Sequence, residues 1–314
     1  MDLKALKYLT DQCGNGTMPA LADLHIHEGR AQAGNGRYWV EADCDLPTCT
    51  VNAAKLAAAW AACKTTPEAL VKDSTLTVKA GRVRARIALS DHGSYPRTTP
   101  DPRTHPAAGV TAQLARLQPY VATDASRPWA TSVCIGGGWA YATNNVVLVR
   151  APFPDLGVTV NLPLSVFDAV IAKGEPTGMG VSENSLTFWF PEDLWIKTNL
   201  ISGQWPTAVV DGLVNSLGED WETPHPDLGA MLATAAKLSD DRHPVVEFKD
   251  GGLGLVDGSF GADELVPVPD AGKVNARMAA LVFERATAVK WHTPRQDVHA
   301  FRVGDITGVF GGQR

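Results

Sequence analysis

The feature that most constrains the fold is a short motif that occurs three times at nearly equal spacing. In each copy a valine ends an extended stretch and an asparagine follows it, at Val51-Asn52, Val160-Asn161 and Val274-Asn275. The pairs lie 109 and 114 residues apart. Self-similarity at a fixed period is typical of a module that a chain uses repeatedly. The sequence therefore predicts three related units.

Each asparagine is predicted to begin a helix, because its side-chain oxygen can accept a hydrogen bond from backbone N–H groups that lack a partner in the first turn. Apolar residues follow at helical spacing. They are Leu56, Trp60 and Cys63 in the first copy, and Met278, Leu281, Val282 and Val289 in the third. We expect these helices to span residues 52 to about 64, 161 to 174, and 275 to about 290.

The same order of elements is predicted in each third of the chain: an opening helix, strands, the capped helix and a closing hairpin. Opening helices are expected over 2–12, from about 111, and over 227–238, and a strand of the last third over 265–268. The proline-containing stretches 91–108 and 206–226 are interpreted as linkers. Alternating strands bury one face of each sheet, and helices must cover that face. The prediction is an α+β fold with domains at 1–105, 106–210 and 211–314.

Composition indicates an ordinary soluble protein. Of 314 residues, 45% are hydrophobic and 20% are charged, which suffices for a buried core. The sequence contains no apolar run of about 18 residues and begins without an apolar signal segment, so we expect neither a membrane span nor secretion. Five cysteines without paired short spacings favour reduced thiols over disulfides or structural zinc. The net charge of −6 disfavours a protein that is basic over its whole surface.

Three short stretches, taken in order, give the chain a resemblance to a known family. They are Met18-Pro19-Ala20-Leu21-Ala22-Asp23-Leu24, Ala140-Tyr141-Ala142-Thr143-Asn144-Asn145 and Leu200-Ile201-Ser202-Gly203-Gln204-Trp205-Pro206. With three tandem α+β units, they resemble the bacterial DNA sliding clamp, the beta subunit of DNA polymerase III. The turn has Asn144-Asn145 where that family has Asp-Gly, and the C-terminus lacks the family's methionine-rich tail. These departures indicate a compact, divergent relative, and a phage source is one interpretation of them.

The resemblance implies a processivity factor without catalytic residues, cofactor or metal. Two three-domain chains would close into a homodimeric ring, with sheets outside and helices lining a hole for double-stranded DNA. Sliding requires sequence-independent attraction to phosphates rather than readout of bases. Basic residues on or near the predicted helices are the candidates for this lining: Lys4, Lys7, Lys55, Lys64, Arg116, Lys173, Lys237, Arg277 and Arg285. Scattered solvated charges are the alternative interpretation of the same residues.

The resemblance also implies a pocket for peptides of the DNA polymerase and the clamp loader. The matching positions are Thr143, Asn145, Val146, Leu148, Pro206, Val309 and Phe310, with Val210 and Leu213 as weaker additions. Ordinary strand packing is the alternative for the apolar members. The stretch 82–89 is the candidate edge for pairing between chains, and its alternating arginines equally fit protection of an exposed edge. A cytoplasmic location is expected, in a bacterial cell or in the host of a phage.

Two other classes of function remain open from the residues. His25 and His27 lie one residue apart on a predicted strand, an arrangement that suits a metal in amidohydrolase-like enzymes. The remaining histidines do not follow the repeated strand–helix units that such an enzyme needs, so we expect an exposed pair on a solvated strand face. A scaffold protein built from repeats would share the predicted fold without a DNA-binding hole.

Overall fold

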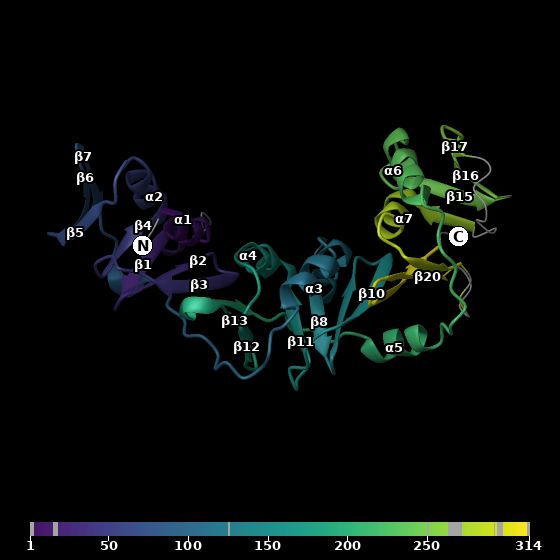
Figure 1. Cartoon of the computed structure of the whole chain (residues 1–314), viewed down its shortest axis with the longest axis horizontal. Helices are drawn as coiled ribbons and strands as arrows, with labels where there is room; N and C mark the ends of the chain where they lie inside the picture. Colours follow the sequence, from purple (N-terminus) through teal and green to yellow (C-terminus); the bar gives the residue numbers. More distant parts are fainter. Residues whose placement is uncertain are drawn as a thin grey trace. The chain divides into compact units, whose positions relative to one another are not determined.

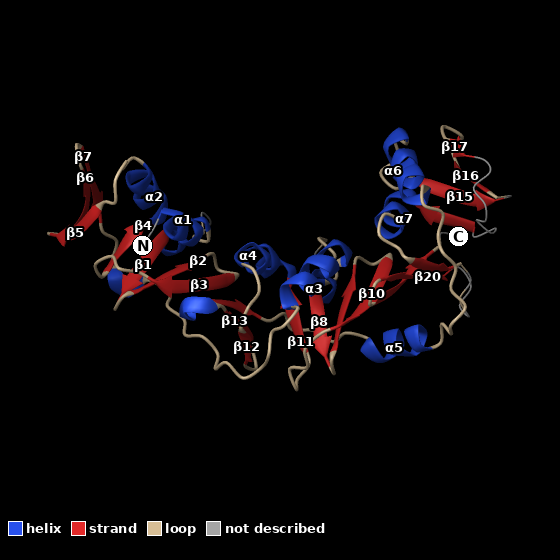
Figure 2. Cartoon of the chain, in the orientation of Figure 1, coloured by secondary structure: helices blue, strands red, loops and turns tan. Residues whose placement is uncertain are grey.

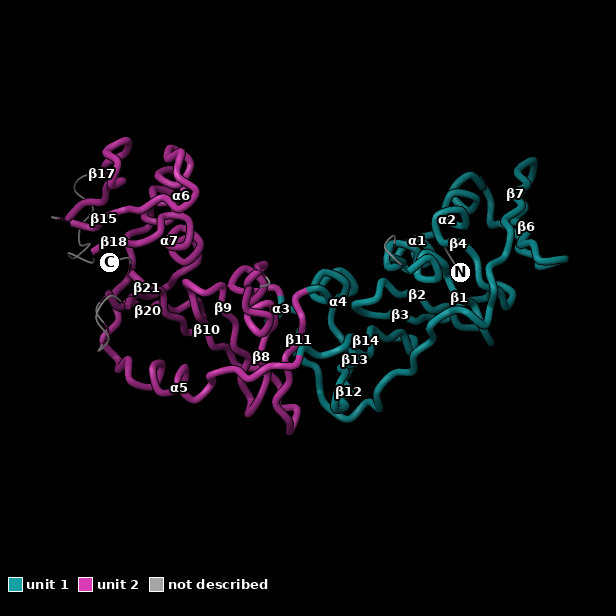
Figure 3. Tube along the Cα trace, turned by 180° about the vertical axis from the view of Figure 1, so that it is seen from behind, with its two compact units in different colours: residues 1–114, 165–201 teal, residues 115–164, 202–314 magenta. Residues whose placement is uncertain are grey.

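The computed structural model describes residues 3–14, 18–124, 126–249, 251–262, 272–291, 293 and 298–312. The strand predicted at 265–268 lies outside these residues. The chain forms two compact units (Figure 3): unit 1 contains residues 1–114 and 165–201, and unit 2 contains residues 115–164 and 202–314. Both units combine helices with antiparallel sheets (Figures 1 and 2), as the predicted α+β class requires. The division into three domains stays a prediction.

Unit 1 is built on a seven-stranded antiparallel sheet in the order β12-β13-β14-β3-β2-β1-β4. Its strands are β1 (Asp23–His27), β2 (Arg30–Gly34), β3 (Tyr38–Asp43), β4 (Cys49–Asn52), β12 (Gly178–Val181), β13 (Ser185–Trp189) and β14 (Trp195–Asn199). A smaller sheet contains β5 (Glu68–Lys72), β6 (Thr75–Ala80) and β7 (Val83–Ala88). Helices α1 (Leu3–Asp11), α2 (Ala53–Ala61) and α4 (Phe167–Lys173) lie along one side of the large sheet (Figure 2).

Unit 2 contains a second seven-stranded sheet, in the order β11-β8-β9-β10-β21-β20-β19. Its strands are β8 (Ser132–Gly136), β9 (Trp139–Thr143), β10 (Val147–Pro152), β11 (Val160–Pro163), β19 (Ala288–Lys290), β20 (Val298–Val303) and β21 (Ile306–Gly311). A four-stranded sheet contains β15 (Val245–Lys249), β16 (Gly252–Leu255), β17 (Gly261–Ala262) and β18 (Gly272–Asn275). The helices are α3 (Val110–Leu117), which begins in unit 1, α5 (Thr207–Asn215), α6 (Leu228–Leu238) and α7 (Ala276–Phe283).

Opposite faces of the second large sheet are covered by different helices. Phe310 of β21 packs against Phe283 of α7, with ring centroids 5.7 Å apart. Its neighbour Val309 points to the other face, where it joins a buried cluster with Val210 and Val214 of α5. Successive strand residues point to opposite faces. Helices α7 and α5 therefore sandwich β21.

Two of the three predicted asparagine caps are confirmed. The Oδ1 atom of Asn52 accepts a hydrogen bond from the Lys55 backbone N–H at 3.1 Å, and Asn275 does the same for Met278 at 3.1 Å. The cap predicted at Asn161 is wrong. Asn161 continues β11, where it pairs with Cys134, and its amide donates to the Gly203 carbonyl at 2.8 Å. The helix begins later, at Phe167.

The predicted extents of other elements also need correction. The third capped helix ends at Phe283 instead of continuing to about 290, and residues 288–290 form strand β19. The stretch 206–226 is not only a linker, because it contains helix α5. Strands β5 and β12 were not predicted.

At the β9–β10 turn Asn145 has φ +73°, a left-handed conformation that asparagine tolerates better than most residues other than glycine.

The prediction of an exposed His25–His27 pair is wrong. His25 is only 2% exposed, and the segment after β7 covers it. Its Nδ1 lies 2.9 Å from the Thr50 hydroxyl, which also lies 3.1 Å from His92 Nδ1. The His92 and Tyr95 rings stack on His25, with centroids 4.2 and 4.9 Å away. His25 is therefore buried under the stretch that was predicted to be a linker, whereas the side chain of His27 is 31% exposed.

Loss of a cap should weaken the fold locally. Asn52→Ala removes the acceptor for the Lys55 N–H, and we expect a decrease of about 1 kcal/mol in the free energy of unfolding. Asn52→Asp keeps an acceptor at the same place and should retain most of the stability. Chemical denaturation checks this, with the exposed Asn199→Ala as a control. Equal stability of Asn52→Ala and wild type would contradict the capping role.

The buried histidine should make the fold sensitive to acid. Burial, followed by the charges of His92, Arg97 and His27, lowers the pKa of His25 from 6.5 to about 4. The unfolded chain therefore binds a proton at this histidine more readily than the folded chain. Neutral His25 contributes to the free energy of unfolding above pH 6.5, and this contribution is lost as the pH falls toward 4. The loss from this one group is on the order of 3 kcal/mol.

Denaturation curves between pH 7 and 4 test this expectation. His25→Gln should flatten the decline relative to wild type, because the substituted side chain does not titrate. The exposed His243→Gln serves as the matched control and should follow the wild-type curve. An unchanged pH dependence in His25→Gln would show that the buried histidine is not its source.

Candidate functional site

Three of the residues predicted for the partner pocket lie side by side on one face of the second large sheet. Leu148 of β10 pairs with Thr143 of β9 on one side and with Val309 of β21 on the other. Residues directly opposite each other on antiparallel strands carry their side chains on the same face. The structure therefore brings Thr143, Leu148 and Val309 into a row, although they come from distant parts of the sequence.

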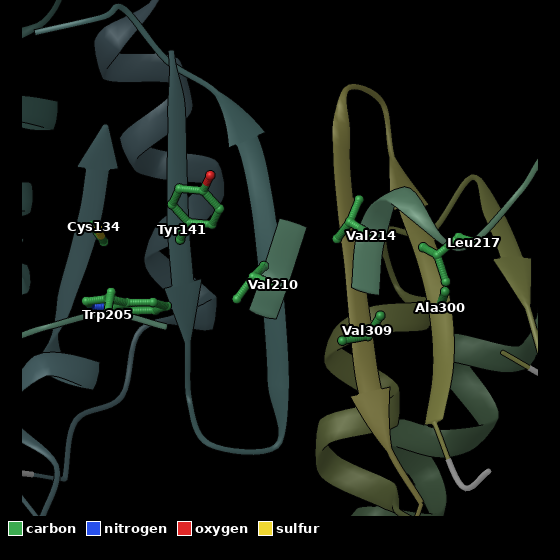
Figure 4. Packing of buried hydrophobic residues seen from close by; sticks show 8 residues of the cluster. All are labelled: Cys134, Tyr141, Trp205, Val210, Val214, Leu217, Ala300 and Val309. Carbon is green, nitrogen blue, oxygen red and sulfur yellow. The ribbon is translucent and has the colours of Figure 1, made fainter. Parts of the chain in front are cut away.

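Helix α5 packs on the same face, where its residues Val210 and Val214 join a buried cluster with Val309 (Figure 4). The cluster of buried residues contains Cys134, Tyr141, Trp205, Val210, Val214, Leu217, Ala300 and Val309. Leu148 and Leu213 are partly buried against it. The sequence signal for α5 was present in the apolar residues at 210, 213, 214 and 217, which have helical spacing. The prolines that flank this stretch led to its interpretation as a linker.

A polar contact fixes α5 to the sheet beside the apolar cluster. Asp211 of α5 accepts hydrogen bonds from the Tyr141 hydroxyl at 3.0 Å and from Arg150 Nη1 at 2.8 Å. The Arg150 side chain is 12% exposed, and its guanidinium lies 4.3 Å from the centroid of Trp139. Burial, together with the Asp211 carboxylate, raises the pKa of Tyr141 to about 12, so the hydroxyl keeps its proton and donates. Neither Arg150 nor Asp211 was among the predicted residues.

The remaining predicted pocket residues are placed elsewhere around this face. Pro206 is exposed at the start of α5. Asn145 and Val146 lie in the turn between β9 and β10, where Val146 is 40% exposed. Phe310 is 1% exposed on the opposite face of the sheet, with its ring near Phe283 and Phe301. The structure therefore does not bring Phe310 together with the row of Thr143, Leu148 and Val309.

A groove of about 560 Å³ lies at the exposed turn. It joins the turn to the end of the α3 region, the loop before β15 and the first turns of α7. Its lining includes Val121, Asp124, Asn144, Asn145, Val146, Arg242, His243, Arg277, Met278 and Leu281. Arg242 and His243 were missed by the sequence analysis, because no local pattern connects them to a turn almost a hundred residues earlier.

Two predicted cations meet beside helix α1 in unit 1. Lys4 of α1 and Lys173 of α4 line a cavity of about 310 Å³ together with Tyr8. The ammonium of Lys173 lies 5.4 Å from the centroid of the Tyr8 ring, within the range of a cation–π contact. Both lysines are exposed on the helical side of the sheet. The lining of this cavity therefore contains one lysine from α1 and one from α4.

The other predicted cations are distributed differently. Lys237 and Arg277 both line a cavity of about 470 Å³ in unit 2. Arg116 is engaged within the fold, because it forms an ion pair with Asp305 at 2.6 Å and donates to the Val303 carbonyl. Arg285 forms an ion pair with Glu284, in which its Nη1 lies 3.6 Å from the carboxylate oxygen Oε2. The remaining three are exposed: Lys7, Lys55 and Lys64.

The geometry does not favour the metalloenzyme alternative. Within the ranges that the structure describes, no three His, Cys, Asp or Glu side chains are arranged to hold a metal ion. The His25 ring is instead hydrogen-bonded to the Thr50 hydroxyl and stacked against the rings of His92 and Tyr95. Among those same described residues, no helix is long and apolar enough to cross a membrane.

Comparison with known proteins yields matches of structure but not of sequence. No family model matches the chain, and no curated protein matches its sequence. The beta subunit of DNA polymerase from Streptococcus pyogenes covers 99% of this chain and 97% of its own, with a TM-score of 0.80 and 14% identity. The Helicobacter pylori beta clamp bound to a DNA ligase peptide has the same coverage, a TM-score of 0.77 and 12% identity.

A third solved structure has the same architecture. The Pseudomonas aeruginosa sliding clamp bound to griselimycin covers 99% of this chain and 96% of its own, with a TM-score of 0.76 and 16% identity. The match in each case spans almost the whole of both chains. The predicted resemblance is therefore confirmed for the fold: this chain has the fold of the bacterial DNA sliding clamp, the beta subunit of DNA polymerase III.

Proposed function

We propose that this chain is a DNA polymerase processivity factor, a sliding clamp that encircles duplex DNA and tethers a replicative polymerase. The observation that carries the proposal is the likeness to clamps over 99% of this chain. The likeness also spans 96–97% of each of those solved chains. The proposal assigns no catalytic residue, because holding DNA requires enclosure and weak attraction rather than bond chemistry.

The distribution of charge supports this role. The chain is acidic overall, with a net charge of −6, yet Lys4, Lys7 and Lys173 are exposed on the helical side of the unit 1 sheet. A net negative charge keeps non-specific binding to nucleic acid weak, and a local group of lysines attracts phosphates without reading the bases. We assign these lysines, with Lys55, Lys64 and Lys237, to the DNA-facing surface.

Two copies would form the ring, and the row of Thr143, Leu148 and Val309 would bind partner peptides beside α5. Solved relatives of the same fold carry a DNA ligase peptide and griselimycin, which supports a peptide site in this fold. The polymerase and the clamp loader are the proposed partners. A cytoplasmic location follows from this role in replication.

The ring is tested first by the mass in solution. Light scattering coupled to size-exclusion chromatography should give a value near twice 33.4 kDa. The same preparation should be retained on closed circular DNA and released when the circle is cut, because a ring slides off a free end. A monomer that remains monomeric on DNA, or equal retention on linear and circular DNA, would contradict enclosure.

The lysine assignment is tested by charge reversal. Lys4→Glu with Lys173→Glu should weaken binding to a short linear duplex and reduce the slope of log K against log salt, by about 0.9 for each phosphate that the protein no longer neutralises. Lys72→Glu, at a side chain that is 77% exposed on β5, is the single-charge control and should leave the slope unchanged. An unaltered slope in the double variant would remove these lysines from the DNA-binding surface.

The peptide site is tested at Leu148. Leu148→Glu places a charge in the row beside Val309 and α5. Arg150, two residues further along the same strand, is already paired with Asp211. We expect loss of binding to a clamp-binding peptide of the polymerase, measured by fluorescence anisotropy, with retention of the fold by circular dichroism. The control is Val158→Glu at a residue that is 50% exposed. Unchanged peptide affinity in Leu148→Glu would refute the assignment.

A further inference from the structure

A strap of chain, residues 91–105, crosses one face of the large sheet of unit 1. At its far end the backbone of His105 exchanges two hydrogen bonds with Met179 of the edge strand β12, both at 2.9 Å. Asp101 is 6% exposed, forms an ion pair with Lys197 of β14 at 3.2 Å and accepts hydrogen bonds from two hydroxyls of β13. This end of the strap is therefore anchored by backbone pairing and by a buried carboxylate.

The first part of the strap, residues 91–98, is held by side chains. Thr98 exchanges two hydrogen bonds with the side-chain amide of Gln32 on β2, at 2.9 and 3.0 Å. The ring of His92 stacks on His25 of β1, with centroids 4.2 Å apart. The two parts of the strap thus have separate attachments, and the attachment of the first part contains a histidine on each side of the contact.

Three imidazoles meet at this contact. The ring centroid of His27, also on β1, lies 6.1 Å from that of His25 and 5.4 Å from that of His92. The Thr50 hydroxyl lies 2.9 Å from His25 Nδ1 and 3.1 Å from His92 Nδ1. A hydroxyl has one proton, so it donates to one of these nitrogens and accepts from an N–H on the other.

The shared hydroxyl accommodates one added proton but not two. A protonated imidazole donates from both of its nitrogens. If His25 and His92 were both protonated, both Nδ1 atoms would donate to the Thr50 oxygen, and the hydroxyl proton would lose its acceptor. Among the described residues, the buried Nε2 of His25 has no hydrogen-bond partner. The N–H that protonation places there would lack an acceptor, which is unfavourable in a buried site.

Two carboxylates face the cluster without compensating for its charge. Glu28 lies 3.6 Å from His27 Nε2, but its side chain is 83% exposed, so solvent screens the pair. Asp23 precedes His25 by two residues and therefore shares its face of β1. Arg97 brings a positive charge from the strap. Burial, followed by the charges of the neighbouring cations, still lowers the pKa of His25 to about 4.

The other ionisable groups around this part of the strap are bonded or uncharged. They are Arg30 with Glu41 and Asp43, Asp91 with the Gly93 backbone N–H, and Cys13 and Tyr95, whose pKa values are raised by burial. The surroundings of the three histidines therefore favour their uncharged forms.

Release of the first part of the strap would remove this restriction. A solvated imidazole takes up a proton below about pH 6.5, whereas His25 in the closed form does so only near pH 4. The released form binds more protons between these values, so its population rises as the pH falls. Strand β1 keeps its hydrogen bonds to β2 and β4 in either form.

We propose that His25, His27 and His92 form a proton-operated latch, which holds residues 91–98 on the sheet at neutral pH and releases them in acid. The anchor at Asp101 and the sheet itself stay intact. Release uncovers the face of β1 that carries two of the histidines. This opening is local and differs from unfolding of the whole chain, and the inference does not depend on the proposed function.

Hydrogen–deuterium exchange of the full-length protein at pH 7 and pH 5 measures the release. After correction for the intrinsic pH dependence of exchange, residues 90–98 should exchange on the order of twentyfold faster at pH 5, the ratio that the pKa shift of His25 alone gives. Residues 101–105 and strands β1 and β2 should remain protected at both pH values.

A double variant removes the titrating groups and keeps the stacked rings. His25→Phe with His92→Phe should abolish the difference between pH 7 and pH 5 in residues 90–98, because neither ring can take up a proton. The control, His105→Phe with His243→Phe, makes the same substitutions at the anchored end of the strap and at an exposed site. It should behave as wild type does.

A second variant alters the latch without removing a histidine. Thr50→Val keeps the shape of the buried side chain but removes the shared hydroxyl, which weakens the closed form. The midpoint of release should move to higher pH by roughly half a unit, and Thr50→Ser should retain the wild-type midpoint. This variant keeps the test decisive if the phenylalanine variant fails to hold the strap.

Three results would overturn the latch. The first is equal corrected exchange of residues 90–98 at pH 7 and pH 5 in wild type. The second is loss of protection in β1, β2 and residues 101–105 at the same pH, which would show unfolding of the sheet. The third is an unchanged midpoint in Thr50→Val, or the full pH effect in the double phenylalanine variant.

Discussion

Pairing between strands that are distant in sequence is the interaction on which the rest of each unit depends. In unit 1, Val40 of β3 pairs with Ile196 of β14, and both are fully buried. In unit 2, Leu148 of β10 pairs with Val309 of β21. Each pairing merges two smaller sheets into one of seven strands, so that unpaired edges are avoided at the join.

The same pairing creates the candidate site. Thr143 and Leu148 lie on one side of the β10–β21 boundary, and Val309 lies on the other. Helix α5 then covers this face through Val210 and Val214, while Phe310 turns to the opposite face and packs against α7. A partner that binds here contacts parts of the chain that no continuous segment contains. The register of one strand pair thus decides which residues can act together.

Local features of the sequence predicted much of this architecture, and contacts between distant segments account for the errors. Asn52 and Asn275 cap helices because the required hydrogen bond joins residues three apart, which the sequence displays directly. Asn161 has the same local pattern, but its pairing with Cys134 and its bond to Gly203 hold it in a strand. His25 was predicted to be exposed, since nothing near it in sequence shows that Tyr95 would cover it.

The residues of the candidate site also divide into those that the sequence predicted and those that only the fold brings together. The resemblance identified Thr143, Leu148 and Val309, which the fold brings together, and also Phe310, which it does not. Arg150 and Asp211 could not be found from the sequence, because their contact joins residues 61 apart whose pairing depends on where α5 lies. Arg242 could not be predicted either, because only the fold brings the loop before β15 to the same groove as the β9–β10 turn.

The tryptophans around α5 give this surface an optical property. Trp205 lies in the buried cluster, and Trp129 and Trp139 pack against it. The rings of Trp129 and Trp205 meet edge to face, with centroids 4.9 Å apart, while the Arg150 guanidinium lies over Trp139. Indole emission shifts with the polarity and charge around the ring. Displacement of α5 by a partner would therefore change the intrinsic tryptophan fluorescence of the chain, so binding at this surface can be followed without an added label.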